Sequence, residues 1–244
     1  MNTSALKAFA QQARQLLRES VERRMIYWGF DAKGNNSASV EAVKGGYTFR
    51  GKVSDDVSVS GKWNKLKAAI SKTSFDEVVE KASYTWFNRL LAIKILSKNG
   101  YETAQIDYLS DETKTPAILE RARRGQYFFL NNAEQQRLKV ILTDYEKEQD
   151  AFAILLIGYC HQHPLLQGIF GSIDDYTELL LPDDILTENG FLYFLNTTDA
   201  ITEEDYKQVE LIGWLYQFYI SEKKDEVFAG FKKNKKAESK DIPA

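Results

Sequence analysis

Helical periodicity over most of the chain is the feature that most restricts its fold. Apolar residues recur at intervals of three and four positions in four stretches, from Ser4 to about Tyr27, from Asn64 to Lys98, from about Ala133 to Gln162, and after Thr202. Such spacing places the apolar side chains on one face of an α-helix. The four prolines, which would interrupt helices, are all isolated. The periodicity therefore predicts a mainly α-helical fold.

Capping residues predict where some of these helices begin and end. Ser74 is followed three residues later by Glu77, which is the spacing of a capping box, so the second stretch is expected to form two helices. Thr202 and Asp205 have the same spacing before the last helix. Pro164 is expected to close the third stretch, because proline lacks the backbone donor that a continuing helix needs.

A β-hairpin is predicted at about residues 47–63, where the apolar period changes to two. Apolar and polar residues alternate along two short segments, 47–53 and 57–63, and Ser54-Asp55-Asp56 supplies the expected turn. The preceding segment from Gly29 to Gly46 is rich in Gly, Asn and Ser and lacks periodicity, so it is expected to be a mobile loop. The expected fold class is mainly α, a multi-helix domain with one small β-hairpin.

Composition and charge exclude several classes of protein. Hydrophobic residues make up 43% and charged residues 27% of the chain, as in soluble globular proteins, which argues against disorder. No apolar stretch approaches the roughly 20 residues of a membrane-spanning helix, and the single cysteine, Cys160, cannot form an internal disulfide. We therefore expect a cytoplasmic protein without a membrane partner. The net charge of −3 means that any contact with DNA must come from local basic patches.

Two such patches are candidates for contact with a nucleic-acid backbone. Arg50, Lys52 and Lys62 fall on the polar face of the predicted hairpin, because alternate strand residues point to opposite faces. Arg121 and Arg124 lie one turn apart on a short predicted helix, and three consecutive aromatic residues follow it. The alternatives are that the hairpin cations only solvate an outer face, and that the aromatic residues belong to the core and its rim.

Other polar clusters favour structural interpretations. Cys160, His161 and His163 carry metal-ligating groups, but their spacing lacks the two ligand pairs of a closed zinc site. Acidic pairs occur at positions 174–175, 183–184 and 203–204. Two of the three lie just inside predicted helix starts, where the helix dipole favours carboxylates. We therefore expect neither a metal site nor a catalytic acid among these residues.

Aromatic and aliphatic residues at helical spacing are expected in the core. Trp86, Leu90 and Ile93 share one face of the second helical stretch, and Trp214 and Phe218 share one face of the last helix. Stripes of this kind ordinarily pack against neighbouring helices. We expect both sets to be buried rather than to bind a ligand.

Four segments carry a resemblance to a known family. They are Met1-Asn2-Thr3-Ser4-Ala5-Leu6-Lys7, Trp86-Phe87-Asn88-Arg89-Leu90, Glu178-Leu179-Leu180-Leu181-Pro182-Asp183, and the stretch from Ile212 to Phe228. On these segments the chain resembles, over essentially its whole length, the PglX family of BREX phage-defence systems, which are adenine-specific DNA methyltransferases. The resemblance implies that residues 1–230 form an N-terminal helical accessory domain. Residues 231–244 would then be a lysine-rich linker toward a methyltransferase domain.

The resemblance does not extend to catalytic residues. In the family, the methyltransferase domain that follows has an S-adenosylmethionine site and an Asn-Pro-Pro-Tyr type motif that grips the extruded adenine. That motif needs two adjacent prolines, whereas Pro116, Pro164, Pro182 and Pro243 are separate. No glycine-rich loop between a strand and a helix is evident for a nucleotide. We therefore expect no cofactor and no catalysis in this chain, and S-adenosylmethionine as the cofactor of the full-length parent.

Three functions follow from these observations, in order of preference. The leading hypothesis is a non-catalytic domain that supports the methyltransferase, either by weak, non-specific contact with the DNA backbone or by docking the parent's own methyltransferase domain. The alternative is a protein-interaction module that recruits other BREX proteins, because aromatic residues are enriched in interface cores. A stand-alone enzyme is disfavoured, since the sequence offers no nucleophile-base set, nucleotide loop or metal quartet.

Overall fold

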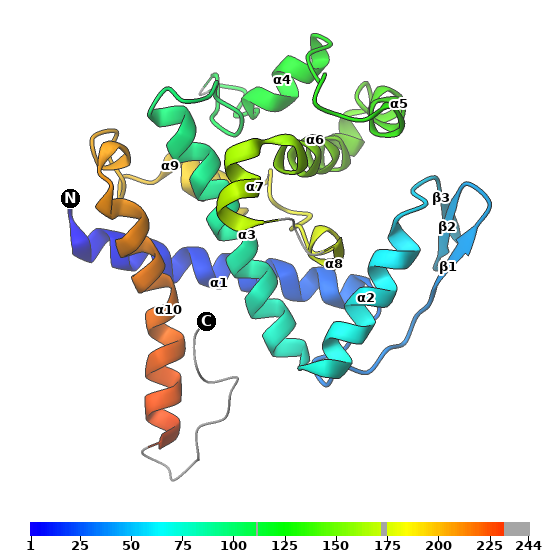
Figure 1. The fold of residues 1–244 in the computed structure, drawn as a ribbon, viewed down its shortest axis with the longest axis horizontal. Helices are drawn as coiled ribbons and strands as arrows, with labels where there is room; N and C mark the ends of the chain where they lie inside the picture. Colours follow the sequence, from blue (N-terminus) through cyan, green and yellow to red (C-terminus); the bar gives the residue numbers. More distant parts are fainter. Residues whose placement is uncertain (111, 172–174, 232–244) are drawn as a thin grey trace.

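The fold is mainly helical, as the periodicity predicts, and carries one small sheet (Figure 1). The computed structural model describes residues 1–110, 112–171 and 175–231. Within these ranges the elements are α1 Thr3–Tyr27, β1 Val40–Val43, β2 Gly46–Phe49, β3 Lys52–Ser54, α2 Val59–Lys72, α3 Phe75–Lys98, α4 Ala117–Arg123, α5 Asn132–Ile141, η1 Tyr145–Lys147, α6 Glu148–Gln162, α7 Pro164–Phe170, α8 Asp175–Glu178, α9 Phe191–Thr197, η2 Asp205–Lys207 and α10 Glu210–Phe231.

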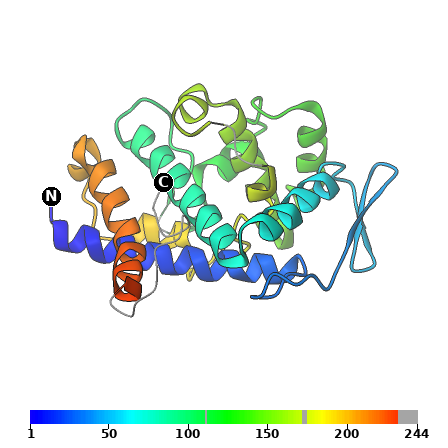
Figure 2. The ribbon, with the colours of Figure 1, turned by 60° about the horizontal axis from the view of Figure 1, so that its bottom comes forward.

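Helix α1 runs along the length of the molecule, and the other long helices pack across it. Figures 1 and 2 show α10 at one end of α1 and the sheet with α2 near the other end, while α3 crosses between them. Asn2 begins α1 by accepting a hydrogen bond from the backbone N–H of Ala5 at 3.1 Å. This cap satisfies one of the free donors at the helix start.

Two hydrophobic cores lie along α1. The first core includes Leu6 and Phe9 of α1 and takes further buried side chains from α3, α4, α6, α9 and α10. The second core includes Met25 of α1, and it takes buried side chains from the sheet, from α2 and from the first half of α3. Because α1 and α3 contribute to both cores, they join the two cores into one body.

Caps at two predicted helix starts are present. The Ser74 hydroxyl accepts from the backbone N–H of Glu77 at 3.1 Å and begins α3, so the second helical stretch divides where expected. Thr202 and Asp205 bond reciprocally, with Asp205 N to Thr202 Oγ1 at 3.2 Å and Thr202 N to Asp205 Oδ2 at 3.0 Å. This pair opens the short helix η2, and the last helix, α10, begins only at Glu210.

The predicted hairpin at residues 47–63 is wrong in its second strand. Residues 59–63 form the first turn of α2, and the sheet instead gains β1 from the segment predicted to be a mobile loop. The strands pair antiparallel in the order β1-β2-β3, with the second reversal at Arg50 and Gly51 rather than at Ser54 to Asp56. The period-two interpretation failed because buried residues at spacings of four and three continue from Val59 along α2.

The third helical stretch is also shorter than predicted. It breaks after Ile141, and α6 begins anew at Glu148 after the short helix η1. Pro164 ends the run as expected, but it also occupies the first position of α7, where a missing backbone donor costs nothing. Pro182 precedes a series of turns, and α9, which the sequence did not suggest, follows at Phe191.

Candidate nucleic-acid interface

Positive charge is concentrated in one part of the molecule. Residues 23–72, here called the basic lobe, include ten Lys and Arg and four Asp and Glu, for a net charge of +6 in a chain whose total is −3. The basic lobe contains the end of α1, the sheet and α2, which surround most of the second core. The chain is therefore acidic as a whole but contains a strongly basic region.

Most cations of the basic lobe face solvent. Three are neutralised by acids of the segment 178–184, since Arg23 pairs with Asp184, Arg24 with Asp183 and Lys62 with Glu178. Six others are exposed and lie beyond ion-pair distance of every carboxylate that the structure describes: Lys33, Lys44, Arg50, Lys52, Lys67 and Lys72. Charges of this kind are available to an external anion.

An exposed tyrosine lies between two arginines at the edge of the basic lobe. Tyr27, at the end of α1, is 41% exposed. The guanidinium of Arg24 lies 4.8 Å from its ring centroid, and that of Arg50 lies 5.7 Å away. Arg50 also donates to the backbone carbonyl of Ile26 at 3.3 Å. These contacts hold Arg50 against α1 and reduce the entropy it would lose on binding a phosphate.

The sheet is anchored to the helices by two tryptophans. Trp63 of α2 donates through Nε1 to the carbonyl of Trp28 at 3.1 Å, and Trp28 donates through Nε1 to the carbonyl of Leu179 at 2.8 Å. Phe49 of β2 packs against Trp28 with ring centroids 5.1 Å apart. At Gly46, an added Cβ would lie 1.8 Å from the carbonyl oxygen of Ser54, so only glycine fits there.

The predicted triad of Arg50, Lys52 and Lys62 is not assembled on one hairpin face. Arg50 lies in the turn between β2 and β3, Lys52 begins β3, and both are exposed. Lys62 lies on α2, with its Nζ 2.6 Å from Glu178 Oε2. The structure thus keeps two members of the triad together and removes the third into an ion pair. Lys44, in the turn between β1 and β2, was not singled out by sequence reasoning.

The second predicted patch, Arg121 and Arg124, is divided between a half-buried and an exposed residue. Arg121 donates to Gln105 Oε1 at 2.5 Å, and burial lowers the pKa of its guanidinium. Arg124, which caps α4, is exposed. Of the aromatic residues that follow, Tyr127 and Phe129 pack against the first core, while Phe128 is 87% exposed. The core-and-rim interpretation therefore holds for the first and third aromatic residues only.

The side chains of Cys160, His161 and His163 lie in different surroundings. Cys160 is fully buried, and burial raises the pKa of its thiol to about 12. His161 Nε2 lies 2.7 Å from Glu178 Oε1, and His163 Nε2 lies 3.0 Å from Glu102 Oε1. In the part of the chain that the structure describes, no group of three His, Cys, Asp or Glu side chains has a metal-binding arrangement.

Glu178 is a buried acid that contacts two cationic or titratable side chains from different helices. Its side chain is 5% exposed and contacts both Lys62 and His161. Burial by itself raises the pKa of this carboxyl, but the hydrogen bonds with His161 and Lys62 outweigh burial and hold the pKa below its usual value. Because Lys62 lies on α2 and His161 on α6, Glu178 joins the basic lobe to the remainder of the molecule.

Members of two of the three acidic pairs make structural contacts. Asp184 binds Ser20 at 3.0 Å and pairs with Arg23, and Asp183 pairs with Arg24 at 3.6 Å. Glu203 pairs with Lys98 at 2.5 Å. Asp174 lies outside the described residues. These carboxylates balance helix cations rather than one another.

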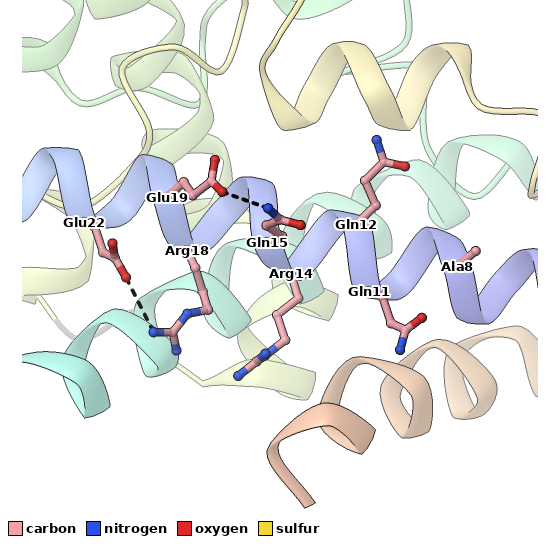
Figure 3. A pocket seen from close by; sticks show the side chains of 8 residues that line it. All are labelled: Ala8, Gln11, Gln12, Arg14, Gln15, Arg18, Glu19 and Glu22. Carbon is pink, nitrogen blue, oxygen red and sulfur yellow. Dashed lines mark hydrogen bonds and ion pairs between the residues drawn. The ribbon is translucent and has the colours of Figure 1, made fainter. Parts of the chain in front are cut away.

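A polar depression lies along α1 (Figure 3). Its lining residues all belong to α1: Ala8, Gln11, Gln12, Arg14, Gln15, Arg18, Glu19 and Glu22. Arg14 binds both carboxylate oxygens of Glu80 at 2.9 Å, and Arg18 contacts Glu80 and Asp76. The arginines are thus neutralised, and the lining offers no histidine, cysteine or hydroxyl group. This depression has no catalytic arrangement.

The predicted core residues are buried on α3 but only partly on α10. Trp86, Leu90 and Ile93 are at most 1% exposed. Trp214 and Phe218 are half-buried and stack on each other with ring centroids 5.5 Å apart. The core face of α10 is instead formed by Leu211, Leu215 and Tyr219. The helix is correctly predicted, but Trp214 and Phe218 lie at the edge of the first core rather than fully inside it.

The fold and its surface define a mainly helical domain with a basic lobe built on a small sheet. Comparison with curated proteins shows which known proteins this chain resembles. Over its whole length, the chain is 37% identical across 250 residues to the adenine-specific methyltransferase BrxX of Escherichia coli O9:H4 (strain HS). It is also 30% identical across 275 residues to the adenine-specific methyltransferase PglX of Lacticaseibacillus casei (strain Zhang).

Over its whole length, the chain matches the N-terminal region of BREX adenine-specific methyltransferases. It spans about a fifth of the length of these relatives, 20% of BrxX and 21% of PglX. No protein-family model matches it. None of the helices that the structure describes is long and apolar enough to cross a bilayer.

Proposed function

We propose that this region is a non-catalytic accessory domain that holds the DNA backbone for an adenine-specific DNA methyltransferase through its basic lobe. The observation that carries the proposal is the net charge of +6 on residues 23–72 within an acidic chain. Lysine and arginine side chains that neutralise phosphates release counterions, and this term dominates non-specific affinity for DNA. Six exposed cations of the basic lobe form no ion pair with a described carboxylate and are suited to this role: Lys33, Lys44, Arg50, Lys52, Lys67 and Lys72.

The positions of the cations favour backbone contact over reading of base sequence. Lys44 and Arg50 lie in the two turns of the sheet, at opposite ends of β2, and Lys52 begins β3. Turn and helix-surface lysines can follow phosphates, but they form no recognition element that enters a groove. Binding should therefore be weak and indifferent to sequence. In this proposal, S-adenosylmethionine and the adenine are bound by the part of the methyltransferase outside the matched fifth.

The test is fluorescence anisotropy with a labelled duplex at several salt concentrations. The lobe variant carries Lys44→Gln, Arg50→Gln and Lys52→Gln. The control variant carries Lys7→Gln, Arg124→Gln and Lys139→Gln, which removes the same charge from exposed positions outside the basic lobe. Each lost phosphate contact should reduce the steepness of the slope of log affinity against log salt by about 0.9. The slope of the lobe variant, which loses three contacts, should therefore be less steep by about 3. A scrambled duplex should compete equally well.

Comparison of the two variants separates a local site from a general effect of charge. We expect the control variant to keep the wild-type slope. An equal reduction of the salt slope in both variants would show that only net charge matters. An unchanged slope in the lobe variant would overturn the proposal. The control includes Arg124, so loss in the control variant alone would assign DNA contact to the patch after α4 instead.

A further inference from the structure

The turn between β2 and β3 contains an arginine in a backbone conformation that disfavours one. Phe49 pairs with Lys52 across the turn, so Arg50 and Gly51 form a two-residue hairpin connection. Both residues have positive φ, 49° at Arg50 and 76° at Gly51. Turns of this kind favour Asn-Gly, and the left-handed region costs an arginine a clash of its Cβ with the backbone. A strained residue that persists in an exposed turn suggests a role for its side chain.

The guanidinium of Arg50 is held in place and still has donors to offer. It lies 5.2 Å from the ring centroid of Phe49 and 5.7 Å from that of Tyr27. Its Nη2 donates to the carbonyl oxygen of Ile26 at 3.3 Å. A guanidinium has two edges with a parallel pair of N–H groups, and a single bond from Nη2 uses only one edge. The other edge is available to an external oxyanion, since no other described residue accepts from this side chain.

Tyr27 is the residue that connects this guanidinium to the helices. It is the last residue of α1, and its ring packs against Phe49 of β2 with centroids 5.5 Å apart. Arg24 also lies against the Tyr27 ring, but it is paired with Asp183 at 3.6 Å. Arg50 is therefore the cation at this ring that has no carboxylate partner among the described residues. Removal of the ring would leave Arg50 with more freedom to move.

We propose that Arg50 is a preorganised binding residue for one phosphate of the DNA backbone, and that Tyr27 is its positioning residue. This inference rests on the proposed function of the basic lobe and assigns the two residues unequal roles within it. Parallel N–H groups match two oxygens of a phosphate, which a lysine ammonium cannot do. A side chain already held against two rings also loses less entropy on binding than an unrestrained lysine such as Lys44. Arg50 should therefore contribute more to affinity than its single charge.

Single substitutions separate the geometry of Arg50 from its charge, with anisotropy of a labelled duplex at several salt concentrations as the readout. The matched control is Lys44→Gln, at an exposed position in the other turn of the sheet. Arg50→Gln and Lys44→Gln should each make the salt slope less steep by about 0.9. Arg50→Gln should weaken binding about tenfold more than the control, because it also removes two charge-assisted hydrogen bonds. Arg50→Lys should keep the wild-type slope and still lose about tenfold in affinity.

A double-mutant cycle tests the positioning role of Tyr27. Tyr27→Leu should weaken binding about threefold or more without a change in salt slope, and it should have no effect when Arg50 is already Gln. Tyr27→Phe keeps the ring and should bind as wild type. Urea midpoints establish that each variant is folded under the assay conditions. Equal losses from Tyr27→Leu in both backgrounds would mean that the ring serves only the fold and would overturn its positioning role.

The same measurements distinguish failure of this inference from failure of the proposed function. If Arg50→Lys binds as wild type, or Arg50→Gln matches Lys44→Gln, the inference about Arg50 is overturned. The proposed function still stands in that case, provided that the lobe variant loses its salt slope. If the wild-type chain does not bind the duplex, both are overturned.

Discussion

At the scale of single residues, Glu178 shows how one buried carboxylate fixes distant elements. It accepts from Lys62 of α2 at 2.6 Å and contacts His161 of α6 at 2.7 Å. The resemblance pointed to the segment that begins at Glu178, but no local pattern indicated these partners. Its role in the described structure is to hold the basic lobe, which carries the proposed DNA contacts, against the rest of the molecule.

Replacement of this carboxylate should destabilise the protein in a pH-dependent manner. Glu178→Gln should lower the free energy of unfolding by about 2–3 kcal/mol at pH 7, because Lys62 loses its counter-charge. The pKa of Glu178 is lowered in the folded state. Its contribution is therefore fully present above the unfolded value of about 4.3 and is lost as the pH falls from there through the folded pKa.

Urea unfolding at several pH values between 7 and 3 measures this dependence. The difference between wild type and Glu178→Gln should shrink below about pH 4.3. Glu146→Gln, at an exposed position, serves as the control and should match the wild type throughout. A difference that stays constant down to pH 3 would mean that Glu178 acts through packing rather than through charge.

At the scale of elements, α10 shows how a helix can be predicted while its orientation is not. The sequence places Trp214 and Phe218 in the core because aromatic stripes usually pack inward. In the structure they are half-buried, whereas Leu215 and Tyr219 are buried in the core and the Tyr219 ring packs against Phe87. Apolar residues surround much of α10, so its own sequence cannot specify which side meets α1.

Truncation of the two neighbouring residues should distinguish these faces. Leu215→Ala should cost about 2–5 kcal/mol of stability, because it leaves a cavity in the first core. Trp214→Ala should cost well under the about 3–5 kcal/mol of a fully buried tryptophan, since its ring is partly exposed. Denaturant midpoints of both variants provide the measurement. A larger loss for Trp214→Ala would show that the aromatic pair, rather than the aliphatic face, anchors α10.

At the scale of the whole molecule, two cores share two continuous helices. Helix α1 contributes Leu17 to the first core and Val21 to the second, and α3 contributes Val79 to the second and Trp86 to the first. Because α1 and α3 belong to both cores, unfolding of either helix disturbs both cores. The sheet of the basic lobe and helix α10 lie at opposite ends of this body (Figures 1 and 2).

The shared helices predict one cooperative unfolding transition. Leu66→Ala in the second core and Leu90→Ala in the first should each lower the free energy of unfolding by about 2–5 kcal/mol. The midpoint of the unfolding transition should fall accordingly. Tryptophan fluorescence and helical circular dichroism should shift together in both variants, because a two-state protein shows coincident probes. Two separate transitions, of which each variant moves only one, would instead define two independent domains.

The sequence by itself predicted those parts of the protein that depend on neighbouring residues. Helical periodicity and the Ser74 and Thr202 caps are local signals, since each involves residues within one or two turns, and they correctly indicated a mainly α-helical fold. The family resemblance likewise rested on contiguous segments. The second strand of the hairpin failed because a spacing of two and a spacing of four share positions over so short a segment.

Only the tertiary structure decided which charges and apolar faces remain available. Lys62 is withdrawn from the predicted triad by Glu178, an acid far away in the sequence. Arg50 and Lys52 stay exposed, and Lys44 joins them in the basic lobe. These outcomes depend on contacts between segments that meet only after the chain has folded. A linear pattern can specify the face of a helix or strand, but the partner that covers that face is set by long-range packing.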